Sequence, residues 1–208
     1  MKIKAIIFDM DGVLIDAKEW HYEALNAALK LFGLEISRYD HLVTFDGLPT
    51  KKKLEMLSLE GGFPQKLHEF VNELKQQYTM EIVYTKCKPI FQHQYALAKL
   101  SAEGFRLAVG SNSVRKTIDV MMEKAGLSKY IDFFLSNEDV IKSKPDPEIY
   151  ITAMQKMNLS PEECLIVEDN DKGIKAALAS GANLLKVEHP GDVDYYKIKN
   201  RINEIEHA

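Results

Sequence analysis

Five short apolar runs, each of strand length, constrain the fold of this chain more than any other feature of its sequence. The last four runs are separated by stretches with helical periodicity. The runs are Ile3–Phe8, Arg106–Val109, Asp132–Leu135, Cys164–Val167 and Asn183–Val187. Strands that alternate with helices are typical of a parallel sheet covered by helices on both faces. We therefore expect an α/β protein.

The segment between the first two runs has a different character. It contains helical patterns and no convincing strand, and Asp16 with Glu19 is typical of the start of its first helix. This predicts a Rossmann-like parallel sheet core with helices on both faces and a small helical cap domain inserted directly after the first strand. The expected core comprises residues 1–16 and 85–208, and the expected cap comprises residues 17–84.

Composition and charge exclude several functional classes. The chain of 208 residues has a net charge of −4, whereas nucleic-acid binders usually carry a basic surplus. The basic cluster Lys51–Lys53 is interpreted as a solvated face. Cys87 and Cys164 lie far apart without metal-ligand spacing, which favours reduced thiols. With no membrane-spanning run and no signal peptide, we expect a cytoplasmic protein that binds neither nucleic acid nor membrane.

Polar and charged residues follow four of the predicted strands. Because ligands of open α/β sheets bind beyond the carboxyl ends of the strands, these residues are expected to share one edge of the sheet. Asp9 and Asp11 follow the first run. The later segments are Gly110–Ser113, Lys142–Pro145 and Glu168–Asp171.

These groups fit the chemistry of phosphoryl transfer. Carboxylates with an open face suit Mg²⁺, which prefers to bind beside a phosphate. A serine hydroxyl, backbone N–H groups and a lysine can hold phosphoryl oxygens. One aspartate can act as a nucleophile, and a second can give a proton to the leaving oxygen and later take one from water.

Each group also has a structural interpretation. Asp-Gly is a common turn dipeptide, so Asp11-Gly12 alone predicts a turn. Ser111 can cap the helix that follows it, and Ser113 is a second candidate for that cap. Lys142 competes with Lys144 for the role in the site, and Glu168 and Asp169 suit the start of a helix. Taken together, the four clusters favour the functional interpretation.

Four motifs resemble those of the haloacid dehalogenase-like hydrolases. They are "DMDGV" at 9–13, "GSNS" at 110–113, "KSKPDPEIY" at 142–150 and "VEDNDKGIKAA" at 167–177, in the order of that family. The resemblance covers nearly the whole chain. It is greatest to the branch of sugar-phosphate phosphatases and β-phosphoglucomutase-like enzymes, whose helical cap is inserted just after the first motif. It also implies a monomer.

The resemblance implies a role for each matching residue. Asp9 would be the nucleophile and Asp11 the general acid and base, and the presence of Asp11 argues against dehalogenation. The residues that would hold the phosphoryl group are Ser111, Asn112 and Lys144. The residues that would hold Mg²⁺ are Asp9, Asp11 through its carbonyl group, Glu168 and Asp169.

Three cap residues are expected to contact substrate. His21 matches a histidine that faces the active site in the β-phosphoglucomutase-like branch. Thr50 stands where β-phosphoglucomutase has an arginine that grips the far phosphate of its substrate. Lys51 or Lys52 could replace that charge, but not the fork geometry of arginine. This departure argues against mutase activity.

The leading hypothesis is therefore a Mg²⁺-dependent phosphatase that acts on a small phosphate monoester through an aspartyl phosphate. The expected substrate is a sugar phosphate or a nucleotide. A sugar phosphomutase of the β-phosphoglucomutase type is the first alternative. A phospho-accepting signalling domain of the response-regulator receiver type is a remote alternative, because such a domain has no reason to carry a helical insert. A non-catalytic binding protein is equally remote, because no catalytic position is lost in this sequence.

Overall fold

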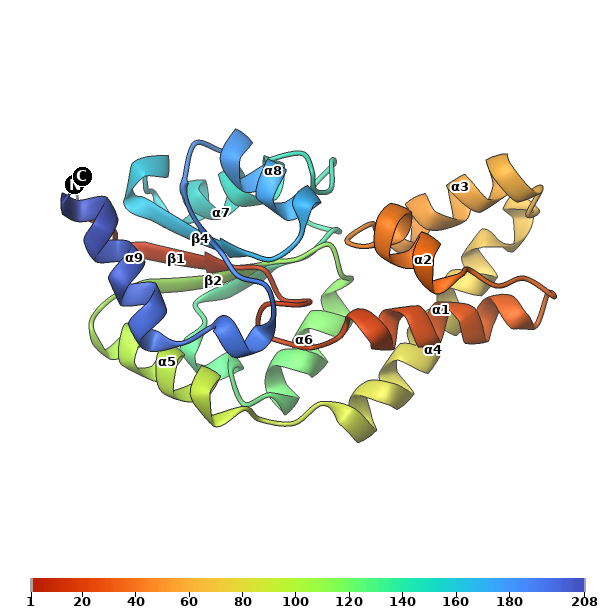
Figure 1. Cartoon of the computed structure of the whole chain (residues 1–208), viewed down its shortest axis with the longest axis horizontal. Helices are drawn as coiled ribbons and strands as arrows, with labels where there is room; N and C mark the ends of the chain where they lie inside the picture. Colours follow the sequence, from red (N-terminus) through yellow and green to blue (C-terminus); the bar gives the residue numbers. More distant parts are fainter. Residues whose placement is uncertain (1, 208) are drawn as a thin grey trace. The chain divides into compact units, whose positions relative to one another are not determined.

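In the computed structural model, which describes residues 2–207, a five-stranded parallel sheet forms the centre of the unit made of residues 2–16 and 88–207 (Figure 1). Its order is β3-β2-β1-β4-β5, and every pairing is parallel. The strands are β1 (Ala5–Phe8), β2 (Arg106–Gly110), β3 (Phe133–Leu135), β4 (Cys164–Glu168) and β5 (Asn183–Lys186). The predicted α/β fold with a parallel sheet is confirmed.

Strand β1 lies at the centre of the sheet, which explains its wholly apolar sequence. Its four residues are buried, since β2 and β4 flank it and helices cover both faces. Phe8 is in register with Val109 and with Val167. The carboxyl ends of these three strands therefore lie at one level, and the residues that follow them share one edge of the sheet.

Helices cover both faces of the sheet (Figure 1). Those of the core are α5 (Phe91–Ala102), α6 (Arg115–Lys124), α7 (Glu148–Met157), α8 (Asp171–Ala179) and α9 (Tyr195–His207). Helices α7 and α8 lie on one face, and α5, α6 and α9 lie on the other. The 3₁₀ turns are η3 (Ser128–Tyr130), η4 (Pro161–Glu163) and η5 (Pro190–Asp192).

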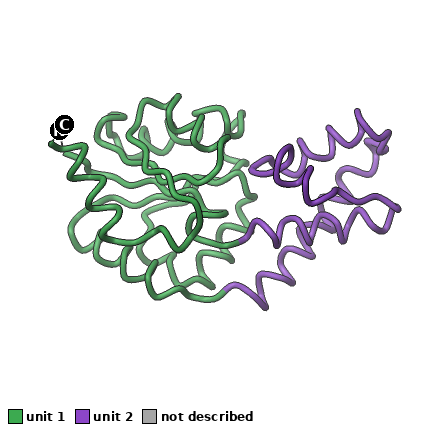
Figure 2. Tube along the Cα trace, in the orientation of Figure 1, with its two compact units in different colours: residues 1–16, 88–208 green, residues 17–87 purple. Residues whose placement is uncertain are grey.

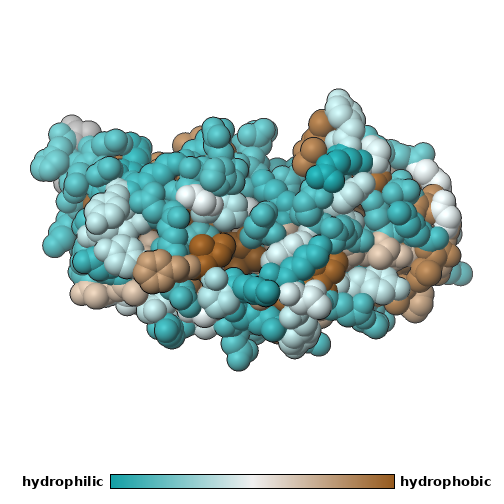
Figure 3. Space-filling model, turned by 60° about the horizontal axis from the view of Figure 1, so that its bottom comes forward, coloured by the Kyte–Doolittle hydropathy of each residue, from teal (hydrophilic) through white to brown (hydrophobic). Residues whose placement is uncertain are grey.

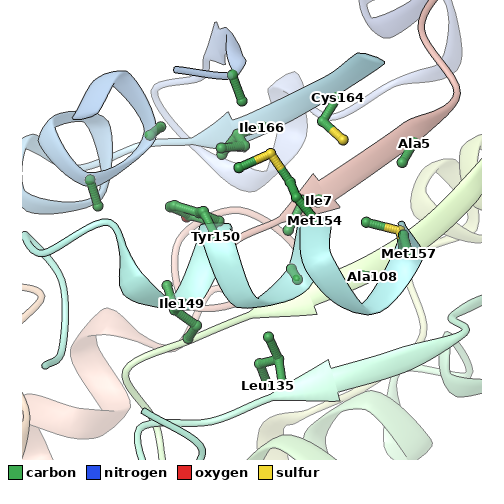
Figure 4. Packing of buried hydrophobic residues seen from close by; sticks show 14 residues of the cluster. Ala5, Ile7, Ala108, Leu135, Ile149, Tyr150, Met154, Met157, Cys164 and Ile166 are labelled. Atoms are coloured by element: carbon green, nitrogen blue, oxygen red, sulfur yellow. The ribbon is translucent and has the colours of Figure 1, made fainter. Parts of the chain in front are cut away.

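The buried core beneath α7 joins that helix to three strands. Ile7 of β1, Ala108 of β2 and Ile166 of β4 pack with Tyr150 and Met154 of α7 (Figure 4). The apolar residues of α7 recur at helical spacing, so one stripe of the helix meets the sheet. This packing fixes Tyr150 beneath the carboxyl edge of the sheet, where its phenol contributes to the site described below.

Residues Ala17–Cys87 form a second compact unit, inserted between β1 and β2 (Figure 2). Its elements are α1 (Lys18–Lys30), α2 (Arg38–Asp40), the π-helix η1 (His41–Phe45), α3 (Thr50–Gly61), η2 (Gln65–Leu67) and α4 (His68–Lys86). It has its own apolar core, which includes Leu25, Leu29, Leu54, Phe63 and Val71. Helix α4 continues to Lys86, so the unit ends at Cys87 rather than at residue 84.

Two local predictions in this unit are wrong. Asp16 does not cap the first helix, because α1 begins at Lys18 with Ala17 at the cap position and no side-chain cap bond. The three lysines Lys51–Lys53 do not share a solvated face, since Lys53 is only 6% exposed. Successive residues of a helix point in different directions, so a run of three in α3 cannot face solvent together.

One face of the molecule is largely hydrophilic. On the face shown in Figure 3, brown hydrophobic residues form limited patches among teal hydrophilic ones. Among residues 2–207, no helix combines the length and the apolar character that crossing a membrane requires.

Candidate active site

Asp9 and Asp11 occupy the turn that leaves the central strand. The N–H of Asp9 donates to the carbonyl of Val167 at 3.0 Å, so the backbone remains anchored to β4 at this point. The chain then turns at Gly12, whose φ is 95°, and its N–H donates to the carbonyl of Ile15 at 2.7 Å. This conformation favours glycine, because residues with a side chain rarely adopt positive φ. The turn therefore directs both acids to the sheet edge.

Lys144 joins two of the predicted site residues. Its ammonium lies 2.7 Å from Asp9 Oδ1 and 2.7 Å from Glu168 Oε1, and all three side chains are buried. Between the two candidate lysines, only Lys144 lies in this cluster, since the side chain of Lys142 is 71% exposed.

Asn112 holds the backbone that carries Lys144. The N–H of Lys144 donates to Asn112 Oδ1 at 3.1 Å, and Asn112 Nδ2 donates to the carbonyl of Lys144 at 3.3 Å. The Asn112 side chain therefore couples the segment after β2 to the segment before α7. Both of these predicted phosphate-binding segments lie at the same edge of the sheet.

The charges around Asp9 are unbalanced. Burial raises the pKa of Asp9 well above its usual value, against the lowering effect of the Lys144 ammonium, while Glu168 and Asp169 raise it further. For Lys144, burial alone would lower the pKa, but the carboxylates of Asp9 and Glu168 raise it, so the lysine stays charged. The charge of Asp11 also raises the pKa of Asp9, so one ammonium stands against four carboxylates, and a bound cation would favour the ionised form of Asp9.

Three of these carboxylates can hold a metal ion together. Asp9, Glu168 and Asp169 each offer an oxygen, and these oxygens lie within 4.8 Å of one another. Such an all-oxygen, anionic set suits a hard divalent cation. The carboxylate of Asp11 does not belong to this set, and the family resemblance predicts that Asp11 contributes its backbone carbonyl instead.

Glu168 is held by the predicted site residue Asp169 and by Tyr150, which was not predicted to belong to the site. The buried phenol of Tyr150 donates to Glu168 Oε1, and the N–H of Asp169 donates to Glu168 Oε2 at 3.1 Å. Burial and the Glu168 charge raise the pKa of Tyr150 well above its usual value, so the phenol remains a donor. At Gly173 an added Cβ would overlap the carboxylate of Glu168. A glycine inside a predicted helix start was the only signal of this close approach.

The two serines after β2 both contact Asp11. Ser113 Oγ donates to Asp11 Oδ2 at 2.7 Å, and Ser111 Oγ lies at 3.5 Å from the same oxygen. The prediction that Ser113 caps α6 is wrong, because Val114 occupies the cap position without a side-chain cap bond. Glu138 provides the cap instead, since its Oε2 accepts from the N–H of Arg115 at 2.6 Å.

The three cap residues named from the sequence all lie in the helical unit. His21 belongs to α1, and its Nδ1 lies 3.1 Å from the Lys75 ammonium of α4. Thr50 and Lys51 are the first two residues of α3. Their contact with substrate remains a prediction.

The sequence that contains the four motif segments matches the sequence model of a known protein family. The sequence model described as haloacid dehalogenase-like hydrolase matches residues 6–187. The chain belongs to the haloacid dehalogenase-like hydrolase family. The matched range includes the acids after β1 and β4, the serines after β2 and Lys144, so the whole candidate site lies in the part that defines membership.

Two named relatives of this hydrolase are phosphatases. The chain is 28% identical to a phosphorylated carbohydrates phosphatase of Thermotoga maritima over 182 residues, covering 86% of this chain and 82% of the relative. It is 31% identical to a phosphoglycolate phosphatase of Aquifex aeolicus over 180 residues, with the same coverage of 86% and 82%. The predicted enzyme class, a phosphatase of the haloacid dehalogenase-like family, is confirmed.

The fold is shared with a solved enzyme of the same branch. A β-phosphoglucomutase from Clostridium difficile has a TM-score of 0.86, covering 99% of this chain and 100% of that one, at 21% identity. At this identity the likeness establishes the fold of the hydrolase. The predicted branch is confirmed by this fold, with its helical insertion between β1 and β2, taken together with the phosphorylated carbohydrates phosphatase named above.

Proposed function

We propose that this hydrolase is a Mg²⁺-dependent phosphatase of a small phosphorylated carbohydrate. The observation that carries the proposal is the buried Lys144 ammonium, placed between Asp9 and Glu168 beside a set of carboxylates that can hold a cation. Phosphorylated carbohydrates are favoured over nucleotides because the Thermotoga relative is named for them, and the name of the Aquifex relative specifies another small phosphate ester, phosphoglycolate, rather than a nucleotide.

Asp9, Glu168 and Asp169, with the carbonyl of Asp11, would hold the cation. Bound Mg²⁺ supplies positive charge that favours ionised Asp9 and offsets its repulsion from the anionic ester. Lys144 contributes fixed positive charge from the protein itself, in a buried setting where such charge acts strongly. Ser111 and Asn112 would orient the phosphoryl oxygens.

In the first step, a carboxylate oxygen of Asp9 attacks phosphorus. An oxygen–phosphorus bond forms to Asp9 while the ester oxygen–phosphorus bond breaks, and the leaving oxygen takes a proton from Asp11. In the second step, Asp11 takes a proton from water as the water oxygen attacks phosphorus. Inorganic phosphate leaves, and the carboxylate of Asp9 is regenerated.

A substrate screen tests this function. The purified protein is assayed with Mg²⁺, and with EDTA in parallel, on glucose 6-phosphate, fructose 1-phosphate, phosphoglycolate and nucleoside monophosphates. We expect phosphate release from a carbohydrate ester with Mg²⁺ and none with EDTA. No release from any ester would refute the proposal, and preference for a nucleotide would change the substrate class.

Two variants test the chemistry. Asp9→Asn is expected to lower kcat/KM by at least about 10³-fold, because an amide is not a nucleophile. Asp119→Asn, on the exposed side of α6, is the matched control and should retain full activity. Acid-quenched unaltered protein should carry one phosphoryl group on the peptide that contains Asp9.

The same assay separates hydrolysis from a mutase. β-Glucose 1-phosphate is supplied, and both glucose 6-phosphate and free phosphate are measured. Conversion to glucose 6-phosphate with little free phosphate would replace the phosphatase proposal with the mutase.

A further inference from the structure

The hydroxyl of Ser113 forms the shorter of the two serine contacts with Asp11. Its Oγ lies 2.7 Å from Asp11 Oδ2, whereas Ser111 Oγ lies at 3.5 Å, the outer limit of a hydrogen bond. The contact joins positions 102 residues apart in the chain. Ser113 therefore contributes the principal hydroxyl contact to Asp11 from the segment after β2.

The backbone of Ser113 is anchored on both sides. Its N–H donates to Ser111 Oγ at 3.1 Å, and its carbonyl accepts from the N–H of Asn137 at 3.2 Å. Ser111 is itself tied to the sheet, because its N–H donates to the carbonyl of Leu135 at 3.0 Å. These three hydrogen bonds fix the position from which the Ser113 hydroxyl reaches Asp11.

The hydroxyl is not used to start the helix that follows it. A serine just before a helix ordinarily caps the helix N-terminus. Here Glu138, from the segment after β3, accepts from the N–H of Arg115 at 2.6 Å and takes that role. Because Glu138 caps α6, the Ser113 hydroxyl is available to donate to Asp11.

We propose that Ser113 is a positioning residue that holds the Asp11 carboxyl in line with the leaving oxygen. The proposal rests on the proposed phosphatase function, in which Asp11 gives its proton to that oxygen. A hydroxyl can donate to a carboxylate and accept from a carboxylic acid, so the contact can persist on both sides of the proton transfer. Ser113 thus acts through Asp11. The effect of Ser113 on the rate therefore depends on how strongly departure of the leaving oxygen requires a proton from Asp11.

That dependence gives a specific readout. A sugar phosphate releases an alkoxide, which leaves well only when a proton arrives in the same step. p-Nitrophenyl phosphate releases a stabilised phenolate, which leaves without help from an acid. The parameter kcat/KM reports the steps up to the first irreversible one, here the transfer to Asp9, so it isolates the role of Asp11 as an acid from its later role as a base.

The experiment compares two Ser113 variants on both kinds of ester. Ser113→Ala is expected to lower kcat/KM for the carbohydrate ester by about 10- to 100-fold, as for a misplaced catalytic group, and for p-nitrophenyl phosphate by less than about threefold. Ser113→Thr keeps the hydroxyl and should stay within about threefold of the unaltered enzyme on both. Ser101→Ala, at an exposed residue of α5, is the control and should change neither.

Three kinetic results would overturn the inference. They are an equal loss on both esters for Ser113→Ala, no loss on either, or equal impairment of Ser113→Ala and Ser113→Thr. Crystal structures of the unaltered protein and of Ser113→Ala test the positioning without any assay, and an unmoved Asp11 side chain would also overturn it. Inactivity of the unaltered protein on every ester would instead contradict the proposed function.

Discussion

The ammonium of Lys144 lies 2.7 Å from a carboxylate oxygen of Asp9, although 135 residues separate the two in the chain. The same ammonium lies 2.7 Å from Glu168. Lys144 is therefore the only cation that the structure places between these two buried carboxylates, within the described residues 2–207. We expect both stability and function to depend on this single charge.

Replacing Lys144 with methionine should destabilise the protein by about 3–5 kcal/mol at neutral pH, because Asp9 and Glu168 then lose their buried partner. Burial already raises the pKa of Asp9, and loss of the ammonium raises it further. A carboxyl with a raised pKa in the folded state costs stability as pH rises, so the deficit should shrink between pH 7 and pH 4.

Chemical denaturation across this pH range measures that deficit. Lys142→Met, at the exposed neighbouring lysine, is the matched control and should change the free energy of unfolding by less than about 0.5 kcal/mol. A Lys144→Met deficit that is constant with pH would indicate lost packing rather than lost charge.

Substitution of Gly173 by alanine should displace the carboxylate of Glu168, since an added Cβ would overlap it. We expect the Mg²⁺ concentration for half-maximal activity to rise about 10- to 100-fold, as when a metal ligand loses its support. Gly61→Ala is the control, because no atom lies within 4 Å of a Cβ there. If Gly173→Ala keeps the Mg²⁺ requirement unchanged, Glu168 does not depend on this close approach.

Removal of the Tyr150 hydroxyl should cost about 1–3 kcal/mol of unfolding free energy, because the buried Glu168 carboxylate loses a donor. Thermal or denaturant unfolding of Tyr150→Phe measures the loss. Tyr196→Phe, at a tyrosine that is 67% exposed, should cost less than about 0.5 kcal/mol. Equal stability of the two variants would mean that the phenol of Tyr150 gives Glu168 no net support.

Because of His41 in the helical unit, the free energy of unfolding should fall as the solution becomes mildly acidic. Burial, aided by the charge of Lys53, lowers the pKa of His41 from 6.5 to about 4. As pH falls from 6.5, the unfolded chain binds a proton that the folded chain does not, so the folded state loses stability. The loss by pH 4 is up to about 3 kcal/mol, given about 1.4 kcal/mol for each pKa unit.

Unfolding free energies of the unaltered protein and of His41→Gln, measured from pH 7.5 to pH 4, check this expectation. The difference between the two proteins should be constant above pH 7 and should change below it, with the unaltered protein falling more steeply. Parallel curves over the whole range would show that His41 is protonated in the folded protein as readily as in the unfolded one.

Local sequence was sufficient for the architecture. Apolar runs of strand length can be recognised without knowledge of their partners, and all five predicted runs overlap the observed strands. Parallel strands end at a common edge, so the positions of Asp9, Ser111 and Glu168 relative to the sheet followed from the ends of those runs. The helical insertion was visible for the same reason, because helical periodicity is a property of neighbouring residues.

Contacts between distant segments could not be read in this way. Tyr150 is the last residue of the motif at 142–150, but its bond to Glu168 depends on how α7 packs against β4. The motif favoured Lys144 over Lys142, but only the path of the loop shows that the Lys144 side chain is buried and that of Lys142 is exposed. Ser113 was expected to cap α6, but Glu138 reaches that position from beyond β3.

The sequence by itself thus determined the sheet, the insertion and the four segments that meet at one edge, since these follow from periodicity and from where strands end. Tertiary structure alone decided which side chains touch there. Lys144 bonds to Asp9 and Ser113 bonds to Asp11 because packing brings together groups more than a hundred residues apart. A hydrogen bond depends on distances of a few tenths of an ångström, which no local pattern specifies.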